Sequence, residues 1–419
     1  MHPKSLSKNK IALAAASLTL TLGALTVLYA LREEAGEFPG YETLLDFNPQ
    51  REGGHLLPDK NLRVRSGTQG ISVRWVTNSK GFRNTQEFPY IADEGTYRIL
   101  FLGDSFVDGH RTDQEKTIGY LMEQALSAAL PKGGYSRCEV LISGHNNPTT
   151  AWYGYQEHGS KYQPDLVILG ISLSNDITWN NYGVDMRPVT SPEGVVTLEW
   201  SGRLETDSWS QPNLYLADYA YCSDQILGQR WRERRDTRWS GDHIPYPSPP
   251  ESSRRRVAAA DFTVSLGLFL QPLMPEIEAM YVGFEEVLKS FSTAVKRDGS
   301  KMLVAVFPTR IQVYHSQWFA LTQLYALDAE AFDLGLPNQR IRSALERADV
   351  PFVDLLPEFL HHGEELGQPL FRKRGDSHFN EHAQAITADA LTRSVLSLMT
   401  GHEPDEKRST LQESSAGSR

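Results

Sequence analysis

The sequence predicts an α/β domain in which a parallel sheet lies between two layers of helices. Short apolar runs at 98–103, 139–143, 164–170 and 302–307 have the length and continuity of strands buried on both faces. Segments with helical periodicity separate several of these runs, as expected for a parallel sheet. The composition, with 40% hydrophobic and 22% charged residues, is that of an ordinary globular protein and excludes fibrous or wholly disordered classes.

The elements of this domain follow one another from Tyr97 onward. Upstream of it, the alternating residues 71–76 predict a half-buried strand in a short β-rich lead-in over 37–96. The predicted order is strand 98–103, helix 118–130, strand 139–143, strand 164–170, helix 276–297, strand 302–307, helix 338–348, strand 351–354 and helix 381–399. The domain as a whole is predicted to span 97–401.

A large insert, at about 177–273, interrupts this alternation. Its residues 195–200 predict a hairpin strand, whereas the proline-rich 244–250 excludes regular structure there. The Arg- and Trp-rich stretch 230–239 leaves two interpretations open: a cap that binds a glycan, or a solvated loop. The polar residues 402–419 predict a disordered tail.

The amino terminus has the features of a membrane anchor. Residues 11–31 carry no charge, and Lys4, Lys8 and Lys10 precede them. As a helix this segment spans roughly 30 Å, the thickness of a bilayer core. Residues 1–36 therefore predict a cytoplasmic tip and an uncleaved anchor, with the body in the periplasm or outside the cell. A cleaved signal peptide stays open, whereas a buried core helix is disfavoured because the segment has no polar face.

Charge and cysteine content exclude several classes of partner. The 52 acidic residues exceed the 42 basic ones, and a net charge of −10 disfavours nucleic acid. The two cysteines, Cys138 and Cys222, provide neither a disulfide framework nor a zinc motif. Cys138 lies in an apolar strand, which favours a buried free thiol, although one bridge between the two remains open. No cofactor or metal is expected.

Five residues at strand ends and before the last helix form a candidate catalytic site. Ser105 follows the first core strand in the run Gly-Asp-Ser-Phe. A serine hydroxyl needs a base and a group that orients it, and Asp376 with His378 can supply both. Gly144 and Asn175 follow two further strands, where they can join the Ser105 N–H in an oxyanion hole. Because residue 107 is Val, the serine does not lie in the nucleophile elbow of α/β-hydrolases.

In this order the four blocks resemble the SGNH family, also called GDSL hydrolases. The resemblance implies a flavodoxin-like three-layer α/β/α sandwich, with Ser105 as nucleophile, His378 as base and Asp376 as its orienting acid. It also implies Ser105, Gly144 and Asn175 as oxyanion donors. The lead-in 76–83 resembles that of extracytoplasmic members. The spacing of one residue between Asp376 and His378 resembles that of SGNH-like domains that acetylate alginate and related polysaccharides.

The resemblance leaves two reactions and one binding role open. The first is a serine esterase that removes an acyl group, in the simplest case acetyl, from a carbohydrate or lipid. The second is an O-acetyltransferase for an extracytoplasmic polysaccharide, and the third is a catalytically inactive binding or assembly component. A nucleotide-binding protein is disfavoured because Asp104 and Asp108 occupy the turn where phosphate would bind. The membrane, through 11–31, is the other expected partner.

Overall fold

The computed structural model describes ten segments of the chain, 52–54, 56–65, 72–130, 134–179, 186–190, 196–200, 267–273, 275–325, 329–372 and 377–400. The predicted anchor at 11–31, most of the insert and the predicted tail at 402–419 lie outside the described residues. Among the helices in the described segments, none is long and apolar enough to cross a bilayer.

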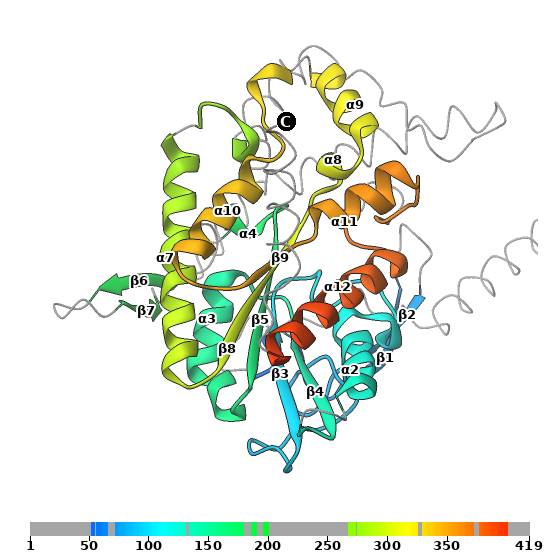
Figure 1. The fold of residues 1–419 in the computed structure, drawn as a ribbon, viewed down its shortest axis with the longest axis vertical. Helices are drawn as coiled ribbons and strands as arrows, with labels where there is room; N and C mark the ends of the chain where they lie inside the picture. The colour runs from blue at the N-terminus through cyan, green and yellow to red at the C-terminus, as the bar shows by residue number, and fades with distance from the viewer. Residues whose placement is uncertain are drawn as a thin grey trace, which may run out of the picture.

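A five-stranded parallel sheet forms the centre of the molecule (Figure 1). Its spatial order is β4-β3-β5-β8-β9. This is the order 2-1-3-4-5 of the flavodoxin-like doubly wound fold, in agreement with the prediction from the sequence. The strands are β3 (Thr96–Leu102), β4 (Arg137–Ser143), β5 (Leu166–Ser172), β8 (Lys301–Phe307) and β9 (Phe352–Asp354).

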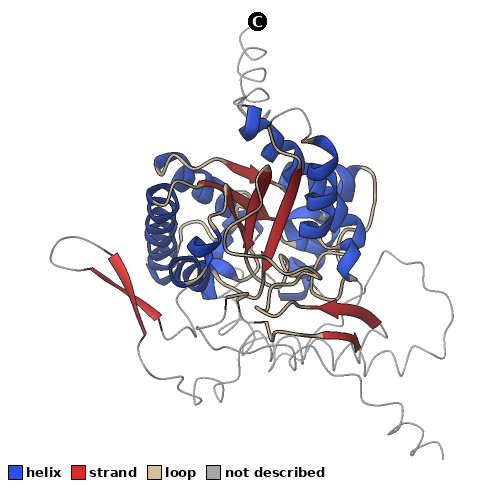
Figure 2. Ribbon diagram, turned by 90° about the horizontal axis from the view of Figure 1, so that it is seen from below, coloured by secondary structure: helices blue, strands red, loops and turns tan. Residues whose placement is uncertain are grey.

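Helices cover both faces of this sheet, and Figure 2 shows the strands between two groups of helices. Buried residues of α3, α7 and α10 form one hydrophobic cluster with one face of the sheet. Buried residues of α2, α11 and α12 form a second cluster on the opposite face. These helices are α2 (Ile118–Ala129), α3 (Pro148–Glu157), α7 (Pro275–Arg297), α10 (Leu336–Arg347), α11 (Leu356–Leu360) and α12 (Glu381–Thr400).

The central strands are buried because both faces are covered. Every residue of β3 and β5 is buried, which explains their continuous apolar sequences. Leu100 of β3 is in register with Leu141 of β4 on one side and with Val167 of β5 on the other. Cys138 is a buried free thiol in β4, and burial raises its pKa, whereas Cys222 lies outside the described residues.

Two smaller antiparallel pairs lie outside the main sheet. The strands β1 (Asn61–Arg65) and β2 (Ser72–Val76) pair within the lead-in, where the sequence predicts only the second of them. The strands β6 (Met186–Thr190) and β7 (Val196–Trp200) form the hairpin expected from residues 195–200. The periodicity does not reveal α3 or α11, nor the helices α4 (Asp176–Trp179), α8 (Arg310–Val313) and α9 (His315–Tyr325).

Local signals explain where several helices begin. The Thr117 side chain accepts a hydrogen bond from the Tyr120 N–H and caps α2. Asn147 caps α3 in the same way, since its side chain accepts from the Thr150 N–H at 2.9 Å. Pro148 follows at the first helical position, where a missing N–H costs nothing.

Candidate active site

The candidate nucleophile Ser105 lies in a tight turn immediately after β3. Gly103, just after β3, and Gly170, within the neighbouring strand β5, leave a space that the Val107 side chain fills. A Cβ on Gly103 would lie 2.4 Å from Val107 Cγ2, and a Cβ on Gly170 would lie 2.6 Å from it. The Asp104 carboxylate accepts from the Phe106 N–H at 2.9 Å. The turn is therefore held against the sheet, at the crevice where chain order reverses and ligands bind in such folds.

His378 approaches this turn from the other end of the chain. It lies just before α12 and next to a bridge between Phe371 and Phe379. Ser105 Oγ and His378 Nε2 are 2.8 Å apart, although 273 positions separate them in sequence. Both residues are half-buried. The structure thus brings a serine hydroxyl and an imidazole into hydrogen-bonding contact, the pairing that base-assisted attack requires.

Aromatic rings hold the imidazole of His378 in place. The ring of Phe106 lies 5.1 Å from it and that of His110 4.4 Å from it, between ring centroids. Phe379, fully buried, packs edge-on against Phe106 at 4.8 Å. Because protein interiors are close-packed, these contacts restrict the orientation of the histidine. The predicted orienting acid, Asp376, lies outside the described residues.

Gly144 and Asn175, the two other residues predicted to donate hydrogen bonds in the oxyanion hole, follow β4 and β5. Gly144 is buried, and a Cβ there would lie 2.2 Å from the Cβ of Asp108, so only glycine fits this close approach. The Asn175 side chain helps to lower the pKa of the Asp104 carboxyl, which lies next to Ser105 in the chain. The structure therefore places Asn175 beside the nucleophile turn, and Gly144 against that turn through Asp108.

Three polar residues form hydrogen bonds around the turn that carries Ser105, and the sequence does not single them out. They are Arg83, Thr112 and Arg372. Arg83 is fully buried, stacks on Trp75, and donates to the carbonyls of Asp108, Gly109 and Thr112. Only its place in the lead-in run Lys-Gly-Phe-Arg, part of the family resemblance, could have drawn attention to it.

Arg372 braces the same turn from the other side. Its Nη2 donates to Thr112 Oγ1 at 2.7 Å, and its backbone N–H donates to the His378 carbonyl at 2.9 Å. Thr112 is fully buried, and its carbonyl accepts from Arg83 at 2.6 Å. One threonine therefore links the lead-in, the nucleophile turn and the segment that carries His378.

Replacing Thr112 by valine is expected to loosen this link. Valine keeps the shape of the side chain but leaves the buried Arg372 guanidinium without this acceptor, at a cost of about 1–3 kcal/mol in the free energy of unfolding. We also expect turnover to fall about tenfold, since small displacements of catalytic groups reduce rates. Thr112→Ser retains the hydroxyl and should behave like the wild type in denaturant unfolding and in ester turnover. Equal turnover of the valine and serine variants would contradict this role.

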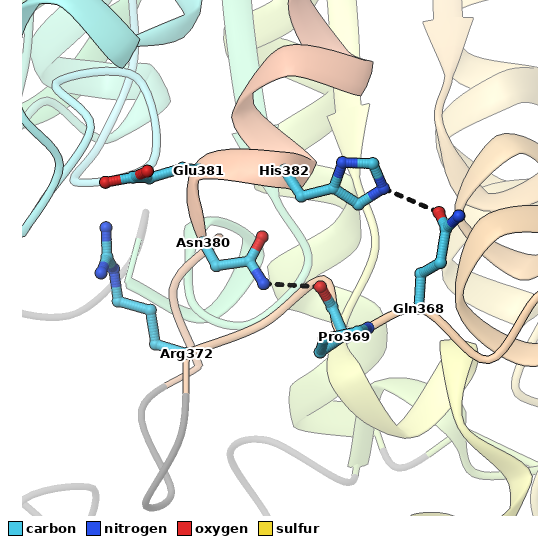
Figure 3. Close-up of a pocket in the computed structure, with 6 residues that line it drawn as sticks. All are labelled: Gln368, Pro369, Arg372, Asn380, Glu381 and His382. Atoms are coloured by element: carbon cyan, nitrogen blue, oxygen red, sulfur yellow. Dashed lines mark hydrogen bonds between the residues drawn. The ribbon is translucent and has the colours of Figure 1, made fainter.

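A pocket of about 570 Å³ adjoins the segment that carries His378 (Figure 3). Within it, His382 Nε2 and Gln368 Oε1 are 2.7 Å apart, and the Asn380 amide donates to the Pro369 carbonyl. Neither Ser105 nor His378 lines it. The lining residues are Gln368, Pro369, Arg372, Asn380, Glu381 and His382.

Comparison with solved structures returns acetylxylan esterases and an alpha/beta hydrolase, at low similarity. The acetyl xylan esterase AlAXEase is 14% identical with a TM-score of 0.37, over 71% of this chain and 99% of its own. LAE5, an alpha/beta hydrolase enzyme from the metagenome of Lake Arreo, Spain, is 14% identical with a TM-score of 0.36, over 73% and 95%. Axe2, an acetylxylan esterase from Geobacillus stearothermophilus, is 14% identical with a TM-score of 0.37, over 71% and 94%.

Comparison of the sequence with protein families is more specific. A search of curated protein sequences finds no match to the chain. Residues 278–418, however, match the family model described as SGNH hydrolase-like domain, acetyltransferase AlgX. This segment includes β8, β9, α12 and His378. Residues 278–418 are therefore similar to an SGNH hydrolase-like domain, in agreement with the resemblance that the sequence blocks carry.

Proposed function

We propose that the protein is a serine-dependent esterase that removes acetyl groups from a carbohydrate through an acyl-enzyme on Ser105. The observation that carries the proposal is the 2.8 Å contact between Ser105 Oγ and His378 Nε2. Asn175, whose side chain influences the pKa of Asp104 beside the nucleophile, supports the predicted oxyanion hole.

The proposed reaction proceeds in two steps. Ser105 Oγ attacks the ester carbonyl carbon, and its proton passes to His378 Nε2. The negative charge on the carbonyl oxygen is stabilised by the Ser105 and Gly144 N–H groups and the Asn175 amide. The bond to the alcohol oxygen then breaks, and His378 returns the proton to that oxygen. Water, activated by the same histidine, releases acetate and restores the serine.

In this scheme His378 must accept a proton at Nε2, so the ring hydrogen resides on Nδ1. A carboxylate facing Nδ1 stabilises that tautomer and the imidazolium that forms. We assign this role to Asp376 on the sequence pattern alone, because Asp-x-His places the acid two residues before the base.

Acetyl transfer is the second candidate function. It is favoured by the match of residues 278–418 to a family model described as an acetyltransferase, and by the Asp-x-His spacing. The first step is unchanged, but a sugar hydroxyl replaces water in the second. The two functions differ only in the acceptor that reaches the acyl-enzyme.

One experiment separates these functions. The full chain is incubated with acetylated xylo-oligosaccharides, and separately with 4-nitrophenyl acetate plus unacetylated glycans. Acetate release from the oligosaccharides supports the esterase, whereas a mass increase of the glycan acceptors supports the transferase. Ser105→Ala serves as the control in both reactions. If neither reaction occurs and Ser105 is not labelled by a fluorophosphonate, the catalytic proposal is wrong and the binding role is favoured.

We also propose that residues 11–31 anchor the protein, with the domain in the periplasm or outside the cell. The support is the uncharged run and the three lysines before it. Protease added to intact spheroplasts should then digest the domain, whereas a cytoplasmic domain would be protected.

A further inference from the structure

His145 lies just after β4, and hydrogen bonds on both sides hold its backbone beside the nucleophile turn. The Asn146 N–H donates to the Gly103 carbonyl at 2.8 Å, and the Gly103 N–H donates to the Ser143 carbonyl at 3.3 Å. These two bonds enclose His145 in the chain. They fix it beside the end of β3, at the edge of the sheet where Ser105 lies and where ligands bind in such folds.

The backbone of His145 adopts a conformation that residues other than glycine rarely take. Its φ is +62°, in the left-handed region. Such a conformation persists only where the surrounding structure fixes it, and residues of this kind cluster at functional sites. The preceding Gly144 is fixed as well, because it lies against Asp108 so closely that a Cβ would not fit. The position of His145 relative to the nucleophile turn is therefore well defined.

A buried carboxylate of the nucleophile turn faces one ring nitrogen of His145. His145 Nδ1 lies 3.5 Å from Asp108 Oδ2, a long contact of the kind that unliganded catalytic sites often show. Asp108 follows Ser105 in the same turn and is fully buried, whereas 23% of the His145 side chain is exposed. Because Nδ1 faces the buried carboxylate, the exposed part of the ring is the side that carries Nε2.

This pair differs from other contacts between a histidine and an acid on the surface. His315 Nδ1 lies 3.1 Å from Glu364, and His361 Nδ1 lies 2.8 Å from Glu365, with both partners of each pair exposed. Exposed pairs of this kind contribute little to stability. A fully buried carboxylate behind a half-exposed imidazole is instead the arrangement that orients a histidine toward a substrate.

The contact with Asp108 determines which hydrogen-bonding role is left for Nε2 of His145. A carboxylate only accepts, so the hydrogen of the neutral ring belongs on Nδ1 and Nε2 carries a lone pair. An acetyl ester has acceptors only and cannot bind such a nitrogen. A hydroxyl group can donate to it, and an acetylated sugar has one on the ring carbon next to the ester. His145 adjoins Gly144, whose N–H is predicted to bind the ester carbonyl.

We propose that His145 is a specificity residue that binds the free hydroxyl group next to the acetyl ester of a carbohydrate. His145 Nε2 accepts the hydrogen bond, and Asp108 positions the ring through Nδ1. The inference rests on the proposed function, because it concerns the alcohol part of the ester that Ser105 attacks. It adds a requirement that the serine chemistry does not impose, namely a neighbouring hydroxyl group on the substrate.

The variant His145→Asn tests this role while preserving the loop. Asparagine tolerates a positive φ, and its amide nitrogen can replace Nδ1 as a donor to Asp108, but it has no group at the place of Nε2. We expect kcat/KM for acetylated xylo-oligosaccharides to fall about tenfold, the effect of losing one hydrogen bond to the substrate. For 4-nitrophenyl acetate, which has no hydroxyl group, kcat/KM should stay within about twofold of the wild type.

His315→Asn is the matched control for this experiment. It makes the same exchange at an exposed histidine on α9 that also contacts an acid, and turnover of both esters should be unchanged. An equal loss on both esters in His145→Asn would assign the residue to water activation or to folding and would overturn the proposal. The absence of any loss on the oligosaccharides would overturn it as well.

Glycan binding tests His145 independently of catalysis. Unacetylated xylo-oligosaccharides retain the hydroxyl groups, so calorimetric titration of the full chain should give an affinity about tenfold lower for His145→Asn than for the wild type. Equal affinities would refute the role of His145, and so would a wild type that neither hydrolyses the esters nor binds the glycan. A wild type that binds the glycan through His145 but hydrolyses neither ester would contradict the proposed function and leave the recognition of the hydroxyl group intact.

Discussion

Ser105→Ala is expected to lower ester turnover by about 10³-fold or more and to abolish labelling by a fluorophosphonate. Alanine lacks the oxygen atom that forms the proposed acyl-enzyme. Because the residues of a catalytic triad act as a unit, removing one of them costs nearly as much activity as removing all of them. The substitution removes one oxygen from a half-buried side chain in a turn that Val107 and the Asp104 carboxylate hold in place. The fold should therefore be retained, as circular dichroism can verify.

Two companion variants sharpen this result. His378→Ala removes the base that lies 2.8 Å from Ser105 Oγ, and we expect a loss of similar size. Asp376→Asn should cost at least about tenfold if that acid orients the histidine. Ser136→Ala, at an exposed serine whose hydroxyl bonds to the Gly95 carbonyl, is the matched control and should leave turnover unchanged. A Ser105→Ala enzyme with more than a tenth of wild-type turnover would falsify the nucleophile assignment.

Glu139→Ala is expected to destabilise the fold by about 3–5 kcal/mol, because it leaves a buried cation without its partner. Arg98 is fully buried in β3, and its Nη2 lies 2.7 Å from Glu139 Oε2 in the adjacent strand β4. The same guanidinium donates to the carbonyls of Pro89, Tyr90 and Tyr162. The pair thus joins the lead-in to the centre of the sheet.

Glu139→Gln is the control for this prediction. Glutamine keeps an oxygen that can accept from Arg98, so the loss in unfolding free energy should be smaller than for alanine. Denaturant unfolding followed by fluorescence and by circular dichroism measures both variants. A loss below about 1 kcal/mol for Glu139→Ala would show that water reaches Arg98 and replaces the lost partner.

Much of the sheet could be predicted because its strands have local signatures. The runs that become β3, β4, β5 and β8 are continuous and apolar, and the structure confirms each of them to within about two residues at either end. The long helices α7, α10 and α12 were likewise expected from periodicity. The helix α8 was missed because four residues are too few to establish a period, and α9 was missed because its apolar residues do not gather on one face.

The site was only partly predictable for a different reason. Ser105, Gly144 and Asn175 follow strands, so the topology of a parallel sheet brings them to one edge. Arg83, Thr112 and Arg372 carry no such signal, because each looks like an ordinary polar residue until its partners are known. Buried arginines are rare without partners, yet burial itself depends on the complete fold.

The sequence by itself determined the α/β class, the strand ends that carry Ser105 and Asn175, and the Asp-x-His block before the last helix. Periodicity and turn chemistry are local, so they can be recognised from the sequence alone. Only the tertiary structure decided that Ser105 and His378 touch across 273 positions, and that Thr112 links Arg83 and Arg372. Such contacts depend on how distant segments pack, which no local pattern along the chain records.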